Sequence, residues 1–196
     1  MSPIVIIGNK GYSAPYLLNA IIVAPLLFLA FVIVVWQQMR TKHLTKLRFL
    51  IETLLLVYGY FLISVTIFPI SIFPPGSTIY RIPFGRQVMV SVNVLTLPTL
   101  NKSQIFGNIL MLMPLSFLMA LLSGEFRTFK SSFLLVFSTS LCIELIQLIM
   151  NFFYLGRRLF DVNDILLNTF GGVIGFALFL VVRYFLTKRI ALSDWK

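Results

Sequence analysis

The sequence is poor in charge, and poorest in negative charge. Only 11% of its 196 residues are charged, and six acidic residues stand against sixteen Lys and Arg. A typical soluble domain contains about 25% charged residues. With 59% hydrophobic residues and a mean hydropathy of +0.97, the composition excludes an ordinary soluble domain and predicts an integral membrane protein.

Cysteine and histidine are almost missing, with one residue of each. The single Cys142 excludes an intrachain disulfide, and the lone His43 gives no basis for a zinc site. The chain also lacks a phosphate-binding Walker loop, an HExxH motif and a GxSxG motif. The residues therefore identify neither a metal nor another cofactor, and they do not determine the oligomeric state.

Long apolar runs are what the sequence has instead. A helix needs about 20 apolar residues to cross the bilayer core. We therefore expect an all-α membrane protein with five transmembrane helices. The expected spans are Tyr16–Trp36, Phe49–Pro69, Ile105–Leu122, Ser131–Phe153 and Ile165–Phe185. The connection 70–104 is too rich in proline and glycine to form a sixth span.

Basic residues between the spans predict how the chain is oriented. Ten of the sixteen Lys and Arg fall on the side that holds the 37–48 loop and the C-terminus, and six fall on the other. Because cytoplasmic loops are enriched in Lys and Arg, we expect an outside N-terminus and a cytoplasmic C-terminus. The net charge of +10 then reflects orientation and contact with anionic lipid, and no nucleic-acid partner is expected. Glu52, at the cytoplasmic end of the second span, is expected to extend to the membrane surface.

Polar side chains recur in three of the expected spans or just before them, and hydrocarbon makes such groups costly. These residues are Asn108, Glu144, Gln147, Asp161, Asp164 and Asn168. Spacings of three and four residues place those of each helix on one face. We therefore expect them to converge in one acidic pocket that opens outward, with Asp161 at its mouth and Arg157 and Arg158 at its rim.

Most of these residues also have a structural explanation. Asp161 can cap the fifth helix, and Asp164 can favour the positive end of the helix dipole. Asn108 and Asn168 can join neighbouring helices through hydrogen bonds worth about 0.6 kcal/mol. Glu144 is the hardest to explain in this way, since an unpaired carboxylate within a span is very unfavourable.

Three blocks of residues follow one another in a specific order. They are residues 107–115 (GNILMLMPL), residues 144–147 (ELIQ), and the set Arg158, Asp161, Asp164, Asn168, Gly171 and Gly175. Within the last block, Gly171 and Gly175 form a small-xxx-small face, for which close helix packing is expected. In order and spacing the blocks resemble the VanZ-like family of bacterial membrane proteins.

This resemblance covers about residues 90–185 and implies both a fold and a role. It implies a VanZ-like membrane domain of four core helices, at residues 49–190, preceded by an extra helix and a basic cytoplasmic loop at residues 1–48. The family takes its name from a teicoplanin-resistance accessory protein. The resemblance therefore implies a role in the bacterial cytoplasmic membrane and cell envelope, with lowered susceptibility to that lipoglycopeptide.

Three functions are compatible with these residues. In the first, the pocket holds a membrane lipid head group or a lipid-linked wall intermediate, whose phosphate contacts Arg81, Arg86, Arg157 and Arg158. In the second, Glu144, Asp161 and Asp164 act in metal-assisted or acid–base phosphoryl or glycosyl chemistry on a lipid-linked substrate. Asn108, Gln147 and Asn168 would then be neutral oxygen donors. In the third, Glu144 carries the proton of a small transporter, a design that five spans without an inverted repeat disfavour.

Overall fold

The computed structural model describes residues 4–40, 45–87, 90–94 and 101–189. Among these residues, five helices are long and apolar enough to cross a membrane: Ala20–Arg40, Lys46–Thr66, Lys102–Leu122, Phe129–Phe152 and Val162–Leu186. The prediction of an all-α membrane protein with five spans is confirmed. The two chain ends, for which we expect an outside N-terminus and a cytoplasmic C-terminus, lie outside the described residues.

The chain forms two compact units that interleave along the sequence. Unit 1 comprises Met1–Thr96 and Leu141–Asn163, and unit 2 comprises Leu97–Ser140 and Asp164–Lys196. The boundary falls within α4 (Phe129–Phe152) and within the first turn of α5 (Val162–Arg189), so each of these helices contributes to both units. The division at residue 48 that the sequence suggests stays a prediction.

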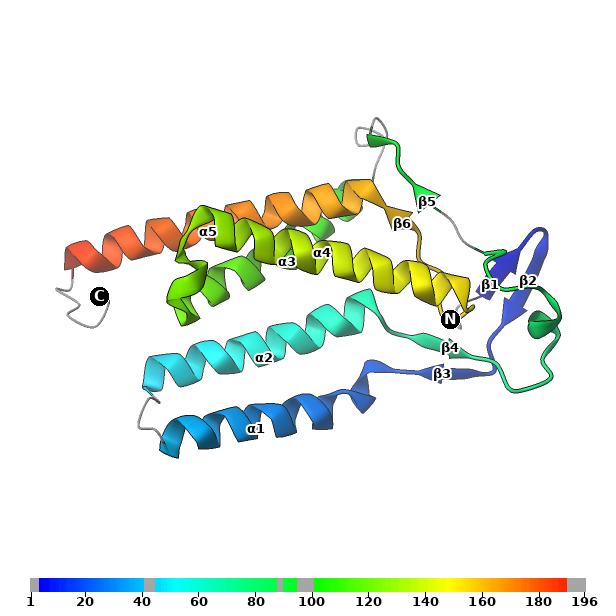
Figure 1. Ribbon diagram of the computed structural model, residues 1–196, viewed down its shortest axis with the longest axis horizontal. Helices are drawn as coiled ribbons and strands as arrows, with labels where there is room; N and C mark the ends of the chain where they lie inside the picture. Colours follow the sequence, from blue (N-terminus) through cyan, green and yellow to red (C-terminus); the bar gives the residue numbers. More distant parts are fainter. Residues whose placement is uncertain (1–3, 41–44, 88–89, 95–100, 190–196) are drawn as a thin grey trace. The chain divides into compact units, whose positions relative to one another are not determined.

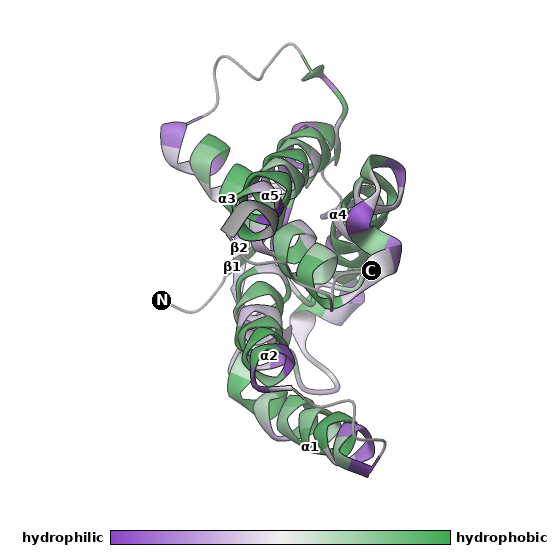
Figure 2. Cartoon of the chain, turned by 90° about the vertical axis from the view of Figure 1, so that its left-hand side faces the viewer, coloured by the Kyte–Doolittle hydropathy of each residue, from purple (hydrophilic) through white to green (hydrophobic). Residues whose placement is uncertain are grey.

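Unit 1 contains a helical hairpin formed by α1 (Ala24–Arg40) and α2 (Lys46–Thr66), which run side by side (Figure 1). Pro25 lies in the first turn of α1, where its fixed φ favours a helix and its missing N–H costs nothing. Thr45 caps α2, because its Oγ1 accepts the backbone N–H of Arg48 at 3.2 Å. Both helices are hydrophobic along most of their length (Figure 2), and no residue in the apolar stretch of α1 is buried.

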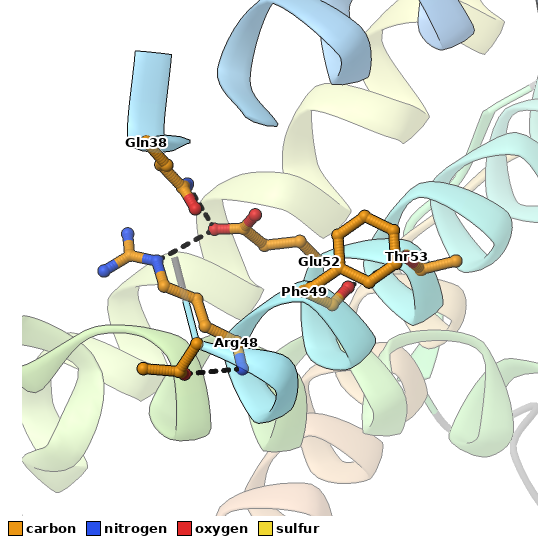
Figure 3. Close-up of polar contacts among 6 residues, drawn as sticks. Gln38, Arg48, Phe49, Glu52 and Thr53 are labelled. Carbon is orange, nitrogen blue, oxygen red and sulfur yellow. Dashed lines mark hydrogen bonds and ion pairs between the residues drawn. The ribbon is translucent and has the colours of Figure 1, made fainter. Parts of the chain in front are cut away.

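A buried carboxylate joins α1 to α2 near the ends that face the 41–44 connection. Glu52 of α2 is 8% exposed, and its Oε1 accepts from Gln38 Nε2 at 2.6 Å and from Arg48 Nε at 3.0 Å (Figure 3). The expectation that Glu52 extends to the membrane surface is therefore wrong. The charge of the Glu52 carboxylate is balanced by Arg48, one helical turn earlier in α2. The side-chain amide of Gln38, in α1, donates to the same carboxylate.

The described segments outside the long helices contain several short strands, and these strands all belong to unit 1. β1 (Ile4–Ile7) and β2 (Lys10–Ser13) make an antiparallel hairpin, and β3 (Tyr16–Leu18) pairs antiparallel with β4 (Ile70–Ile72) (Figure 1). The first span was expected to begin at Tyr16, but Tyr16–Leu18 is strand and the helical stretch begins at Ala20. The reason is long-range: the backbone of β3 bonds to β4, a partner that the local hydropathy does not reveal.

The connection between α2 and α3 carries η2 (Thr78–Arg81) and β5 (Val90–Ser91), which pairs parallel with β6 (Phe160–Asp161). We call the described residues of 4–23, 67–94 and 153–161 the cap. Its buried core consists of Val5, Ala14, Phe73, Ile79 and Tyr154. The cap thus has a hydrophobic core of its own, built from segments far apart in the sequence.

Unit 2 contains α3 (Lys102–Leu122), η4 (Gly124–Arg127), the first half of α4 and nearly all of α5. Gly171 and Gly175 of α5 lie against the backbone of α3. A Cβ at Gly171 would overlap the carbonyl oxygen of Ile109, and one at Gly175 would overlap that of Met113. This close approach is the packing that a small-xxx-small face allows.

Candidate functional site

Three polar residues lie along one face of α4 in unit 1. Glu144, Gln147 and Asn151 follow one another at spacings of three and four residues, and they are 2%, 7% and 0% exposed. Spacings of this kind align side chains on one side of a helix. Each of these three side chains forms a hydrogen bond with a segment outside α4, so this face of α4 holds those segments in place.

Glu144 holds the start of α5. Its Oε2 accepts the backbone N–H of Asp161 at 3.0 Å. The Oδ1 of Asp161 in turn accepts the backbone N–H of Asn163 at 2.9 Å, and the side-chain amide of Asn163 at the same distance. Asp161 is therefore the N-cap of α5. The Asn163 amide also donates to the carbonyl of Asn93 at 3.2 Å, which ties the long connection to this point.

Gln147 and Arg158 satisfy the end of α2. Gln147 Nε2 donates to the carbonyl of Thr66 at 3.0 Å, and Arg158 Nη2 donates to the carbonyl of Val65 at 2.6 Å. The last carbonyls of a helix lack intrahelical partners and form the negative end of its dipole. An amide and a guanidinium from elsewhere in unit 1 thus complete α2, and Arg158 has a structural role that its sequence does not reveal.

Asn151 joins the loop after α4 to the long connection. Its Oδ1 accepts the backbone N–H of Arg158 at 3.0 Å and Nε2 of Gln87 at 2.9 Å, and Gln87 Nε2 also donates to the carbonyl of Gly156 at 2.5 Å. A backbone N–H only donates and a carbonyl only accepts, so these contacts determine the orientation of both amides.

Tyr154 ends α4 in an unusual conformation. Its φ is +62°, and the bonds from Tyr154 N to the Asn151 carbonyl (3.2 Å) and from Leu155 N to the Met150 carbonyl (2.8 Å) form a Schellman motif. Glycine is usual at this position, because a side chain is strained there. The tyrosine is fully buried, and its hydroxyl donates to the carbonyl of Pro83 at 2.6 Å. Burial raises the pKa of Tyr154, and the backbone N–H and charge of Arg86 oppose this rise.

Two exposed arginines are brought together by these contacts. Arg86 follows Gly85, whose N–H bonds to the Phe152 carbonyl at 3.1 Å, and precedes Gln87, which bonds to the carbonyl of Gly156. Arg157 is the residue after Gly156. Arg86 and Arg157 therefore belong to adjacent segments of the cap, and both are exposed.

The acidic residues of unit 1 are all buried. They are Glu52, Glu144 and Asp161, at 8%, 2% and 4% exposure. Arg81, in η2, is a third exposed arginine of the cap, whereas Arg158 is half-buried. Across the described residues of unit 1, the exposed charged side chains are therefore all cationic.

The other predicted site residues lie in unit 2. Asp164 Oδ1 accepts from Asn108 Nδ2 and, at 3.3 Å, from Gln104 Nε2. Asn168 is 1% exposed, and its Nδ2 donates to Ser140 Oγ at 3.1 Å. These bonds join α3 to α5 and α4 to α5 within unit 2.

The structure thus brings together Glu144 with Asp161 in unit 1 and Asn108 with Asp164 in unit 2. One common pocket for all six polar residues stays a prediction. Among the described residues, no group of three or more His, Cys, Asp and Glu is placed to hold a metal ion.

Sequence reasoning missed three members of the unit 1 network: Gln87, Asn151 and Asn163. Asn151 carried a usable signal, since it lies four residues after Gln147 on the same helix face. Gln87 carried none, because its partner Gly156 lies 69 residues away. Asn163 bonds locally to Asp161, but no local pattern indicated its bond to Asn93, 70 residues away.

Comparison with known proteins identifies the family of this chain. A family model described as VanZ/LLP1 matches residues 54–183. The match begins within α2, ends within α5 and includes Asn108, Glu144, Asp161 and Asp164. No curated protein and no solved structure matches the chain.

Proposed function

The chain belongs to the VanZ/LLP1 family, whose model covers most of its length, and it is a multi-pass membrane protein. From this we propose that it acts in the cell envelope of a bacterium, in the cytoplasmic membrane. Its cap would hold the phosphate of a lipid head group or of a lipid-linked wall intermediate. This would lower susceptibility to teicoplanin, an antibiotic with a lipid tail.

The observation that carries the proposal is the charge of the cap. Arg86 and Arg157 are exposed on adjacent segments that the Gln87 side chain holds together, and the acidic residues of unit 1 are buried. Guanidinium groups form paired, charge-assisted hydrogen bonds to phosphate oxygens. Arg81 would add a third contact. Arg158, which we expected in the same role, would instead support the scaffold through its bond to Val65.

The orientation of the cap is part of the proposal. The excess of Lys and Arg at the opposite ends of the spans supports an outer cap, by ten residues to six. Cysteines placed at positions 10 and 196, in a chain whose native Cys142 is replaced by serine, can be labelled in intact cells with a reagent that does not cross the membrane. Labelling at 10 but not at 196 is expected. The reverse result would place the cap in the cytoplasm.

The proposed role is tested by removing the exposed arginines. The double variant Arg86→Gln/Arg157→Gln should restore susceptibility to teicoplanin at normal expression, while susceptibility to vancomycin, which lacks the lipid tail, stays unchanged. Lys46→Gln/Lys130→Gln is the matched control, since it also removes two exposed positive charges, but from the other ends of the spans. Wild-type protection by the arginine variant would refute phosphate binding by the cap.

An enzymatic function is the alternative. The observation in its favour is that two buried carboxylates, Glu144 and Asp161, belong to one hydrogen-bonded network. Such a pair could supply acid and base for phosphoryl or glycosyl transfer on a lipid-linked substrate. Mass spectrometry of lipid extracts from cells with wild-type protein and with Glu144→Gln would test this. Turnover of a lipid-linked species only in the wild type would favour the enzyme over the binding role.

A further inference from the structure

The cap contains a cavity of about 350 Å³ between β2 and the 73–79 segment. Four hydroxyl-bearing side chains line it, those of Tyr12, Ser13, Ser77 and Thr78, together with the ring of Phe73. The volume lies at the lower end of the range of about 300–1,000 Å³ that is usual for small-molecule pockets. A single ring-sized ligand therefore fits its size.

The chemistry of the lining favours a ligand that is rich in hydroxyls and uncharged. Each hydroxyl can both donate and accept a hydrogen bond, and so can each hydroxyl of a sugar. The lining contains aromatic carbon for the apolar face of a sugar ring but no charged side chain, whereas anions are usually held by charged donors. We propose that this cavity binds a neutral sugar ring. The inference is independent of the proposed phosphate contact at Arg86 and Arg157.

Hydrogen-bonding capacity remains in the cavity. Within the part of the chain that the structure describes, neither the Tyr12 hydroxyl nor that of Thr78 forms a hydrogen bond to protein. Ser77 Oγ donates to the carbonyl of Pro74 at 2.6 Å, which leaves its lone pairs able to accept. A sugar would give all three groups partners without breaking a bond of the protein.

The walls of the cavity are held by the core of the cap. Tyr12 stands opposite Val5 in the β1–β2 hairpin, and Val5 is fully buried. Phe73 and Ile79, on the other wall, belong to the same buried cluster. Tyr12 and Phe73 are therefore anchored on the core before any ligand arrives, which lowers the entropic cost of binding.

Saturation-transfer NMR on the full-length protein tests the proposal. The protein is placed in phosphatidylcholine nanodiscs, because detergents with sugar head groups would fill the cavity. Glucose and N-acetylglucosamine are the probes. We expect transfer to the ring protons of at least one of them at millimolar concentration. Tyr12→Phe and Thr78→Val should each weaken its binding about three- to tenfold, the effect of one lost hydrogen bond.

Tyr16→Phe is the matched control, since it removes a tyrosine hydroxyl that is not part of the cavity and whose residue is 64% exposed. It should leave sugar binding unchanged. Thr78 is exposed, so Thr78→Val tests the cavity without endangering the fold. The proposal is overturned if neither sugar shows transfer, if both cavity variants bind as the wild type does, or if inorganic phosphate displaces the sugar.

Discussion

The carboxylate of Glu144 accepts the backbone N–H of Asp161 at 3.0 Å, and Asp161 is the residue that caps α5. Both residues are almost fully buried. A side chain in α4 therefore determines where the next helix begins, through the backbone of the residue that starts it. The Glu144 carboxylate thus holds the backbone of Asp161, and the Asp161 carboxylate holds the backbone N–H of Asn163 in the first turn of α5.

Removing this acceptor should destabilise the protein. Glu144→Ala leaves the buried N–H of Asp161 without its partner, which should lower the free energy of unfolding by about 1–3 kcal/mol. Glu144→Gln keeps an oxygen acceptor and should lose much less. Thermal unfolding in nanodiscs measures both, and Glu125→Ala, at an exposed glutamate, is the control. Equal stability of Glu144→Ala and the control would contradict a positioning role.

Asp161 provides a test of capping against charge. Asp161→Asn keeps an oxygen that can accept the N–H of Asn163, so its stability should stay close to that of the wild type. Asp161→Ala should cost about 1 kcal/mol, the usual loss for a removed N-cap. If Asp161→Asn folds normally but restores susceptibility to teicoplanin, the negative charge of Asp161 has a function besides capping the N-terminus of α5. Normal protection by Asp161→Asn would leave capping as its whole role.

A side chain at Gly171 or Gly175 of α5 should lower the stability of the protein. Gly171→Ala and Gly175→Ala place a Cβ on the carbonyl oxygens of Ile109 and Met113, so α3 and α5 must separate. We expect each substitution to cost about 1–3 kcal/mol, as overpacking typically does. Gly107→Ala on α3 is the control, because its added Cβ would meet no atom within 4 Å apart from the backbone of its own helix. The same unfolding assay compares the three, and a stable Gly171→Ala would show that α5 does not pack this closely.

Tyr154 should make the cap sensitive to alkaline pH. Burial raises its pKa in the folded protein above the ordinary value of 10.0, so the folded state favours the neutral phenol. Its contribution to stability is complete below pH 10 and is lost as the pH rises through the higher, folded-state value. Tyr154→Phe should therefore unfold with a weaker pH dependence between about pH 9 and 12. Tyr16→Phe should retain the alkaline loss seen in the wild type; if Tyr154→Phe retains it too, another group is responsible.

The hydropathy of the sequence was sufficient to predict the class of the protein and its five spans. A bilayer imposes a length and an apolar composition on each helix, and both are local properties that a single segment displays. Spacing along one helix likewise predicted Gly171 and Gly175 as a packing face. For Asp161 the sequence offered capping only as an alternative to a place at the mouth of a pocket. The order and spacing of the three sequence blocks then predicted the VanZ-like family, which the match over residues 54–183 confirms.

Only the tertiary structure decided which backbone groups the polar side chains satisfy. Gln147 and Arg158 complete α2, Gln87 joins two loops, and β3 replaces the expected first turns of the first span. Each of these contacts closes a separation of 50 residues or more. The partner of a buried polar group is set by what the fold brings beside it, and no periodicity in the sequence encodes that neighbour.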